Sequence, residues 1–508
     1  MSVDRTTATI PADRRSVGWG LVVGAAVVAV AVVIWQITVI PHGNPFYGLF
    51  HNMTDLKVYR AGAGTVLHES SLYQHAVWAH LEFTYPPFAA VVFVPFAVMP
   101  LSAAKVVWWV GIYLALVAVV ILGFRSLGYR ADRRLWLFAL CAGVAVTALE
   151  PVRTTIWLGQ INIFLMLIVL ADLVFCDLRR PRSWLRGAGV GIAAGLKLTP
   201  AFMVVYLLAV RRFRAAAVAV VAFVATVVVG FIVIPGDSRD YWGDYVGGAS
   251  RVGRVDSPAN QSINGFISQL LAYFDISRFR QPYPDGGTVY EAPAWLWMPI
   301  AVIAAVLGLW AAVVAYRRQW RLLSVTIAAM TGAAVSPFSW GHHWVWFVPL
   351  LVVAVEAAYR GTRAHRGRWW WWLGPVGIVV CSFAWSYNWW NSGPYRASDH
   401  AIAIGVFMMP RWADVHWYDS LAVVVYSGAY PAVLLGTIIV TLVVAHRGAS
   451  GRVGAESGEA PKPDATDDPG RYPGDPTATQ EDSRQCGPGN DSGSGRANAA
   501  TSSGAILG

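Results

Sequence analysis

Charged side chains are scarce in this sequence. Asp, Glu, Lys and Arg make up 13% of its 508 residues, whereas a soluble globular chain carries about 25%. Hydrophobic residues make up 56% of the chain, the mean hydropathy is +0.48, and there are 25 Trp. This composition excludes an ordinary soluble domain and is typical of a polytopic membrane protein.

Cysteine is also rare, and no acidic metal-binding motif is present in the predicted outer segments. The four Cys stand far apart in no metal-ligand or redox spacing, and we interpret them as structural: Cys141, Cys176, Cys381 and Cys486. No D-x-D motif lies near the segments predicted to face outward, and the chain shows no internal repeat. We therefore expect no metal requirement and no cofactor.

Basic residues gather in short loops between apolar runs. The net charge of +10 does not indicate nucleic-acid binding, because this clustering follows the positive-inside rule and places the N-terminus in the cytoplasm.

A spanning helix needs about 20 apolar residues. The first apolar run, 17–40, is predicted to remain in the protein as a membrane span, because no A-x-A-like signal-peptide cleavage site follows it. Crossings are predicted near 17–40, 103–124, 135–149, 153–175, 215–235, 295–316, 322–336, 343–359, 369–386 and 420–445.

The chain divides by composition into a cytoplasmic segment (1–16), a membrane domain (17–446) and a tail (447–508). The tail is rich in Gly, Ser, Pro, Asp and Ala and has no apolar period. It cannot bury enough apolar surface to fold, so we predict a disordered cytoplasmic tail. The longer loops are predicted on the outer face, at 41–85, 236–294 and 387–419.

Two further apolar runs do not fit simple crossings. Residues 86–100 carry Pro at both ends, and residues 187–210 hold "KLTP" in the middle. Each run is either a re-entrant hairpin, a pair of short helices or one kinked span. Non-helical backbone at membrane depth is tolerated where protein or a wet cavity covers it, so both runs point to a cavity.

An acidic residue follows the first apolar run, in "FHNMTDLKVYRAG" (50–62). The carboxylate of Asp55 could take a proton from an alcohol, and Lys57 and Arg60 could bind an anionic group such as a phosphate. The alternative is a structural carboxylate that pairs with Arg60 or caps a loop helix. Tyr59, in the same segment, is a candidate substrate contact.

Other polar and aromatic residues stand at predicted outer turns. Tyr85 precedes a stiff Pro-Pro pair, and its ring either anchors the membrane interface or contacts substrate. Gln160 and Asn162 follow Gly159, a turn or two into the predicted crossing 153–175. Amides in such runs hold helices together, and they can also hold sugar hydroxyls.

A lysine and a histidine pair complete the set of candidates. Lys197 lies deep in an apolar run, where a charge indicates a functional site, with a phosphate or pyrophosphate as its natural partner; the alternative is a lysine that extends to the interface. His342, His343 and Trp344 lie in "SPFSWGHHWVWFVPLL". Aromatics beside His suit a sugar ring or a phosphate, although an interfacial Trp belt explains the aromatics equally well.

In their order along roughly residues 17–445, several segments resemble glycosyltransferase family 87, which uses polyprenyl-phosphate sugars. "SWGHHW" and "KLTP" look more similar to its alpha-1,2-mannosyltransferases than to its arabinofuranosyltransferases, and the long tail departs from compact members. The segments are "DLKVYRAGAGTVLHESSLY", "FTYPPFAAVVFVPFAVMP", "LGQINIFLMLIVLADL", "GVGIAAGLKLTPAFMVVYLL" and "SPFSWGHHWVWFVPLL".

The resemblance implies an all-α polytopic membrane protein, a GT-C bundle of about 10–12 transmembrane helices whose extracytoplasmic loops form the site. It implies a plasma-membrane mannosyltransferase with its site facing the periplasm. The donor would be polyprenyl-phosphate mannose, and the acceptor a phosphatidylinositol mannoside or the lipomannan and lipoarabinomannan that grow from it. Membrane lipids, but no nucleic acid, are further expected partners.

The resemblance also makes Asp55 the catalytic base of an inverting transfer. The predicted substrate contacts are Lys57, Tyr59, Arg60, Tyr85, Gln160, Asn162, Lys197, His342, His343 and Trp344. Two alternatives stay open: an arabinofuranosyltransferase of the same family, and a transporter or flippase for a lipid-linked sugar. Transporters usually keep their sites near the midplane between repeats, which disfavours the second alternative.

Overall fold

The computed structural model describes most of the chain up to residue 456. The described residues are 15–40, 43–44, 46, 48–175, 183–246, 253–283, 287–364, 368–387, 402–403, 405–408 and 424–456. They lie almost wholly in the compact unit Met1–Val453, which is distinct from Gly454–Gly508. The predicted tail, 447–508, is outside the described residues except where α20 extends to Glu456.

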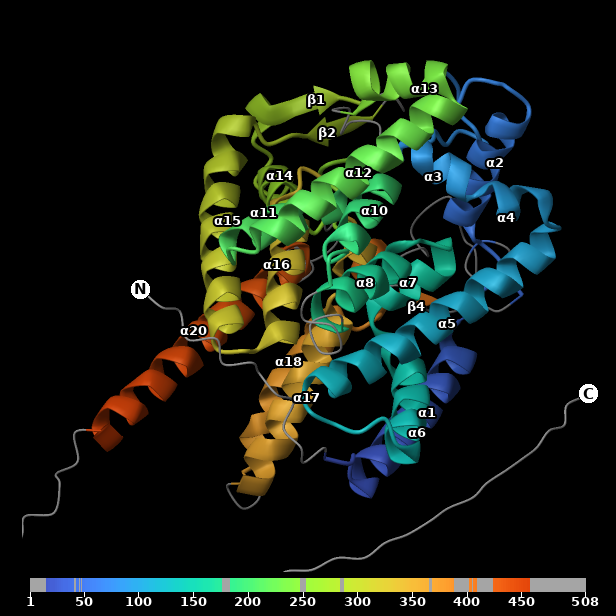
Figure 1. The fold of residues 1–508 in the computed structure, drawn as a ribbon. Helices are drawn as coiled ribbons and strands as arrows, with labels where there is room; N and C mark the ends of the chain where they lie inside the picture. The colour runs from blue at the N-terminus through green and yellow to red at the C-terminus, as the bar shows by residue number, and fades with distance from the viewer. Residues whose placement is uncertain are drawn as a thin grey trace, which may run out of the picture. The chain divides into compact units, whose positions relative to one another are not determined.

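Helices make up nearly all of the described structure (Figure 1). The α-helices of the first half are α1 (Trp19–Val39), α2 (Thr54–Leu67), α3 (Pro87–Val92), α4 (Val94–Val98), α5 (Leu101–Ser126), α6 (Arg133–Ala145), α7 (Glu150–Leu158), α8 (Asn162–Leu170), α10 (Ala188–Leu196), α11 (Phe202–Ala209), α12 (Phe213–Val233) and α13 (Pro235–Asp240). Those of the second half are α14 (Ile263–Tyr273), α15 (Ala294–Arg317), α16 (Arg321–Val335), α17 (Phe347–Ala364), α18 (Leu373–Ser382) and α20 (Ala429–Glu456).

Strands are few and short in the part of the chain that the structure describes. β1 (Arg280–Pro282) pairs antiparallel with β2 (Thr288–Tyr290), and β3 (Ser386–Tyr387) with β4 (Ile402–Ala403). The predicted all-α membrane class is therefore confirmed.

The number of straight crossings differs from the prediction. Five of the described helices, α1, α5, α12, α15 and α20 up to Arg447, are long and apolar enough to cross a membrane, and a bent pair makes a possible sixth. A helix rises 1.5 Å per residue, so α6 (13 residues), α16 (15 residues) and α18 (10 residues) are too short to span about 30 Å alone. The predicted crossing 153–175 is not one straight helix, because the chain bends by 119° between α7 and α8.

Both ambiguous apolar runs form pairs of short helices. Residues 86–100 contain α3 and α4, and residues 187–210 contain α10 and α11 with an extended Lys197 and a short 3-10 turn between them. Of the three predicted alternatives, the pair of short helices is confirmed. Pro87 begins α3, where its missing N–H leaves no hydrogen bond unmade.

The long apolar helices present their side chains outward. Ile37 on α1 is 63% exposed, Ile232 on α12 is 75% exposed, and Val306 on α15 is 61% exposed. Aliphatic side chains at this exposure suit contact with lipid. By contrast, nearly every residue of α16 from Ser324 to Ala334 is buried, so α16 lies at the centre of the bundle.

Small residues bring α10 and α12 into backbone contact. A Cβ on Gly191 would lie 2.2 Å from the Ala219 carbonyl oxygen, and one on Gly195 would lie 2.1 Å from the Thr226 hydroxyl. Close approach at residues four apart is the usual way in which membrane helices pack. This contact fixes the end of α10 and so fixes where Lys197 leaves the helix.

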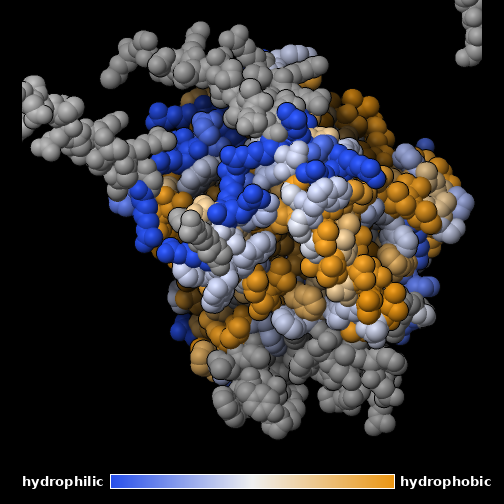
Figure 2. Space-filling view, turned by 90° about the horizontal axis from the view of Figure 1, so that it is seen from below, coloured by the Kyte–Doolittle hydropathy of each residue, from blue (hydrophilic) through white to orange (hydrophobic). Residues whose placement is uncertain are grey.

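The two ends of the bundle differ in character. Figure 1 places α2, α3, α13 and the strands β1 and β2 at its upper end, and the C-terminal part of α17 at its lower end. Figure 2 looks from below and shows hydrophilic residues gathered over part of this face, with hydrophobic residues beside them. The short helices α2, α3 and α13 therefore lie at the end of the bundle opposite this face.

Candidate active site

A sharp break between α7 and α8 forms the floor of the site. Gly159 ends α7 with φ +73°, a left-handed conformation that favours glycine. A Cβ on Gly159 would lie 2.9 Å from Leu56 Cβ, so the first turn of α2 rests directly on the break. The Met53 N–H donates to the Trp157 carbonyl at 2.9 Å and holds the two segments together.

Asp55 stands in the first turn of α2, above this break. The turn is fixed by Asn52, whose Oδ1 accepts a hydrogen bond from the Thr54 N–H at 3.0 Å. Asp55 is partly buried. Burial raises the pKa of its carboxyl to about 6, against the lowering effects of a hydrogen bond from Gln160 and of the Lys197 charge. A carboxyl with this pKa is ionised at neutral pH and basic enough to accept a proton.

Three of the predicted contacts form one buried hydrogen-bonded group. The Tyr59 hydroxyl donates to Gln160 Oε1 at 2.9 Å, and Gln160 Nε2 donates to the Tyr85 hydroxyl at 3.2 Å. The hydroxyl oxygens of Tyr59 and Tyr85 lie 3.1 Å apart. Tyr59 also stacks on Phe93, with ring centroids 4.5 Å apart. Burial raises the pKa of both hydroxyls, and the negative charge of the Asp55 carboxylate, which lies near this group, raises it further.

Lys197 and Asn162 meet at the same place from two different helix breaks. Lys197 Nζ donates to Asn162 Oδ1 at 3.1 Å and lies 5.5 Å from the centroid of the Tyr85 ring. Asn162 Nδ2 donates to the His342 carbonyl at 2.9 Å. A cation, an amide and the histidine turn are thereby joined next to the Asp55 side chain.

The histidine pair lies in a short turn, Gly341–Trp344, that is packed into the protein. The His342 side chain is 2% exposed, and neither of its ring nitrogens has a hydrogen-bond partner among the described residues. His343 Nδ1 also lacks a partner within that part of the chain. Buried polar atoms are normally paired, so these nitrogens are suited to a ligand.

The other predicted contacts lie apart from this cluster. Lys57 Nζ lies 5.9 Å from the Trp78 ring centroid, and Arg60 donates to the Phe96 carbonyl. The Arg60 guanidinium is thus directed to a backbone carbonyl and not to Asp55, which disfavours the structural alternative of an Asp55–Arg60 pair. Trp344 is fully buried against Phe347 and Tyr430, so the structure places it in the core.

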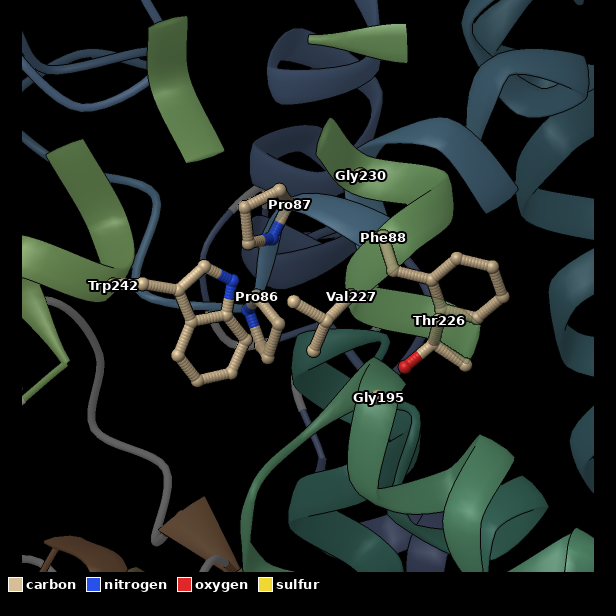
Figure 3. Close-up of a pocket in the computed structure, with 8 residues that line it drawn as sticks. All are labelled: Pro86, Pro87, Phe88, Gly195, Thr226, Val227, Gly230 and Trp242. Carbon is tan, nitrogen blue, oxygen red and sulfur yellow. The ribbon is translucent and has the colours of Figure 1, made fainter. Parts of the chain in front are cut away.

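One hollow borders the cluster, and a second is lined by residues that lie close to it in sequence. One, of about 40 Å³, is bounded by polar Asn162, Thr199 and His343 and by apolar residues of α8, α11 and α16. The other, shown in Figure 3, is a narrow apolar depression in which the Trp242 ring faces Pro86 and Val227. It begins at the residue after Tyr85 and includes Gly195, close in sequence to Lys197.

Sequence reasoning overlooked Thr199 and Trp242, which line these hollows. Thr199 belongs to "KLTP". The position of this motif in an apolar run could have indicated Thr199 as a residue of the site. Trp242 stands in a loop that holds many aromatics, and nothing in its spacing distinguishes it. Among the described residues, no group of three or more His, Cys, Asp or Glu could hold a metal ion.

Comparison with known proteins gives consistent relatives. The profile of glycosyltransferase family 87 matches residues 83–337. A polyprenol-phosphate-mannose-dependent alpha-(1-2)-phosphatidylinositol pentamannoside mannosyltransferase of Mycobacterium tuberculosis is 38% identical over 63% of this chain and 70% of its own. Its namesake from Mycolicibacterium smegmatis is 35% identical over 63% of this chain and 74% of its own.

A second kind of relative has a slightly different name. The polyprenol-phosphate-mannose-dependent alpha-(1-2)-phosphatidylinositol mannoside mannosyltransferase of Mycolicibacterium smegmatis is 33% identical over 64% of this chain and 74% of its own. No solved structure matches significantly.

Proposed function

The chain belongs to glycosyltransferase family 87, and on that premise we propose that it is an integral-membrane mannosyltransferase. It transfers mannose from polyprenyl-phosphate mannose to a phosphatidylinositol mannoside and forms an alpha-1,2 linkage. The names of the relatives support this donor, acceptor class and linkage. The observation that carries the proposal is the meeting of Asp55, Lys197 and the His342 turn, where both His342 ring nitrogens lack a hydrogen-bond partner within the described part of the chain.

In the proposed reaction Asp55 is the base. Its carboxylate accepts the proton of an acceptor hydroxyl while the hydroxyl oxygen forms a bond to the anomeric carbon of mannose. The bond between that carbon and the phosphate oxygen breaks, and the lipid phosphate leaves with the electron pair. A single displacement inverts the anomeric centre, so a beta-linked donor gives an alpha-linked product.

The leaving phosphate needs charge stabilisation more than a proton. Lys197 Nζ, already oriented by Asn162 at 3.1 Å, can offer its remaining N–H groups to phosphate oxygens. Both ring nitrogens of His342 and Nδ1 of His343 have hydrogen-bonding capacity unused within the described residues, and we assign them to the same phosphate.

The remaining predicted contacts keep more peripheral roles in the proposal. Lys57 and Arg60 stand on α2 outside the cluster, where they could attract the acceptor's phosphodiester. Trp344 supports the histidine turn from the core. We place the site on the periplasmic side, and the Arg residues clustered in the segments 125–134 and 360–368, which the positive-inside rule assigns to the cytoplasm, support this orientation.

Product analysis tests the proposal. The purified full chain in detergent, given polyprenyl-phosphate mannose and phosphatidylinositol mannosides, is expected to yield a glycolipid one mannose larger. An alpha-1,2-mannosidase should remove that mannose. Incorporation from polyprenyl-phosphate arabinose instead would support the arabinofuranosyltransferase. Movement of the lipid across vesicles without a new glycosidic bond would support a transporter.

A further inference from the structure

We propose that Glu150 is a positioning residue for His342 and that it acts together with the hydroxyl group of Tyr430. This inference rests on the proposed function, in which His342 binds the donor phosphate. Glu150 stands in the first turn of α7, and no step of the proposed reaction uses it. Glu150 and Tyr430 are both fully buried, and a buried carboxyl group is costly unless polar groups bind it.

Two hydroxyl groups bind the Glu150 carboxylate. The Thr154 hydroxyl donates to Glu150 Oε1 at 2.6 Å from the next turn of α7. The Tyr430 hydroxyl donates to Glu150 Oε2 from α20, 280 residues further along the chain. Both carboxylate oxygens therefore have a donor, and the second donor ties the start of α7 to α20.

The same carboxylate lies directly against the first residue of the histidine turn, Gly341–Trp344. A Cβ on Gly341 would lie 2.5 Å from Glu150 Oε1 and closer still to Oε2. Gly341 is not one of the described glycines with a positive φ, so glycine is needed here for space and not for backbone conformation. Because His342 is the next residue, the position of the carboxylate limits that of the His342 backbone.

A second contact holds the turn one residue further on. Asn162 Nδ2 donates to the His342 carbonyl at 2.9 Å, and Asn162 is itself bound by Lys197 Nζ at 3.1 Å. The turn is thus held at Gly341 by Glu150 and at His342 by Asn162. Contacts at two successive residues fix the direction in which the His342 side chain leaves the backbone, as a group that binds a phosphate requires.

Glu150 also contacts a second segment that lies beside His342. A Cβ on Gly405, at the start of Gly405–Met408, would lie 2.9 Å from both Cβ and Cγ of Glu150. The Phe407 ring of this segment has its centroid 6.3 Å from that of His342. Glu150 therefore packs against the turn that carries His342 and against a segment that lies next to its ring.

The Tyr430 ring has contacts of its own beside the turn. Its centroid lies 5.7 Å from that of Trp344 and 5.0 Å from that of Phe347. Tyr430→Phe keeps these ring contacts and removes only the hydroxyl, so this variant separates hydrogen bonding to Glu150 from packing.

A double-mutant cycle tests this role in the purified full chain, with mannose transfer measured over a range of donor concentrations. Tyr430→Phe should raise the KM for polyprenyl-phosphate mannose about 5-fold, as expected for the loss of one hydrogen bond, and leave the KM for acceptor unchanged. In a His342→Phe background the same substitution should change the donor KM by less than about 2-fold, because the group that it positions is absent. Gly341→Ala, which crowds the carboxylate from the turn, should behave in the same way.

Tyr206→Phe is the matched control, because the buried Tyr206 hydroxyl lies 2.9 Å from Ser324 Oγ on α16, and it should keep the wild-type donor KM. The inference is overturned if Tyr430→Phe and Gly341→Ala leave the donor KM unchanged or add their effects to that of His342→Phe. A rise of the same size in Tyr206→Phe would also overturn it. A wild-type protein that transfers no mannose contradicts the proposed function, whereas an active protein with additive effects removes only this positioning role.

Discussion

Lys197 and Asn162, 35 residues apart, meet at a distance of 3.1 Å between Nζ and Oδ1. Each stands at a break between two short helices, Lys197 after α10 and Asn162 at the start of α8. The breaks bring polar side chains into the interior of an apolar bundle, where backbone groups and charges need partners. The site is therefore a consequence of interrupted helices.

Loss of the Lys197 charge should slow turnover. Lys197→Met keeps the length of the side chain but removes stabilisation of the leaving phosphate, and we expect kcat to fall about 100-fold or more. Steady-state kinetics with polyprenyl-phosphate mannose measure this. Lys105→Met is the matched control. Lys105 lies on α5, and its Nζ donates to the His51 carbonyl at 2.8 Å. Equal losses in both variants would contradict the assignment.

Removal of the His342 ring nitrogens should weaken donor binding. His342→Phe preserves the aromatic packing near Trp340, whose ring centroid lies 6.3 Å away, and removes hydrogen bonds to the phosphate. The KM for donor should rise about 10-fold, as expected for a hydrogen bond to a charged group. The exposed His51 provides a control in His51→Phe. An unchanged donor KM would exclude His342 from the phosphate site.

The wild-type rate should depend on the ionisation of Asp55. Because burial raises the pKa of Asp55 to about 6, kcat/KM should increase with pH through about 6 and level off above it. A profile already flat at pH 5, as for a carboxyl with an ordinary pKa near 3.9, would show that another group acts as the base.

The same pKa predicts a gain in stability for Asp55→Asn. A carboxyl whose pKa is higher in the folded than in the unfolded state stabilises the fold below the unfolded value near 3.8, and this contribution is lost as pH rises through about 6. Above pH 6 Asp55→Asn should melt at a higher temperature than wild type, and below pH 4 the difference should vanish. A lower melting temperature at neutral pH would contradict this burial effect.

Gly159→Ala should disturb the site through the backbone. A left-handed non-glycine residue costs about 1–2 kcal/mol, and the new Cβ would lie 2.9 Å from Leu56 Cβ and displace α2. We expect lower thermal stability and lower turnover. Gly128→Ala is the control, because Gly128 also has a positive φ (+90°) but a Cβ added there would have no atom within 4 Å. Similar losses of turnover in both variants would mean that strain alone, and not contact with α2, is responsible.

The sequence allowed the membrane class and the irregular segments to be predicted, because both depend on local composition. Pro at the ends of 86–100 and "KLTP" within 187–210 are local interruptions of an apolar run. The break at Gly159 was overlooked because a single Gly in an apolar run is usually tolerated. Only the contact with α2, distant in sequence, explains why the helix stops there.

The candidate residues were found more easily than their roles. Residue type and the family resemblance indicated Asp55, Lys197 and the histidine pair. Whether a side chain points to substrate or to the core depends on packing between distant segments, as with Trp344 against Tyr430. The hydrogen-bonded group of Tyr59, Tyr85 and Gln160 joins three segments of the chain. No spacing in the sequence predicts these contacts.

Turnover of Asp55→Asn is the most direct test of the central proposal. Asparagine keeps the shape of the side chain but cannot accept the hydroxyl proton, so mannose transfer to the phosphatidylinositol mannoside should fall by about 100-fold to 10,000-fold while the protein stays folded. Asp237→Asn, which alters a carboxylate that accepts from the Leu72 N–H at 2.8 Å, should retain transfer. Wild-type turnover by Asp55→Asn would contradict the account.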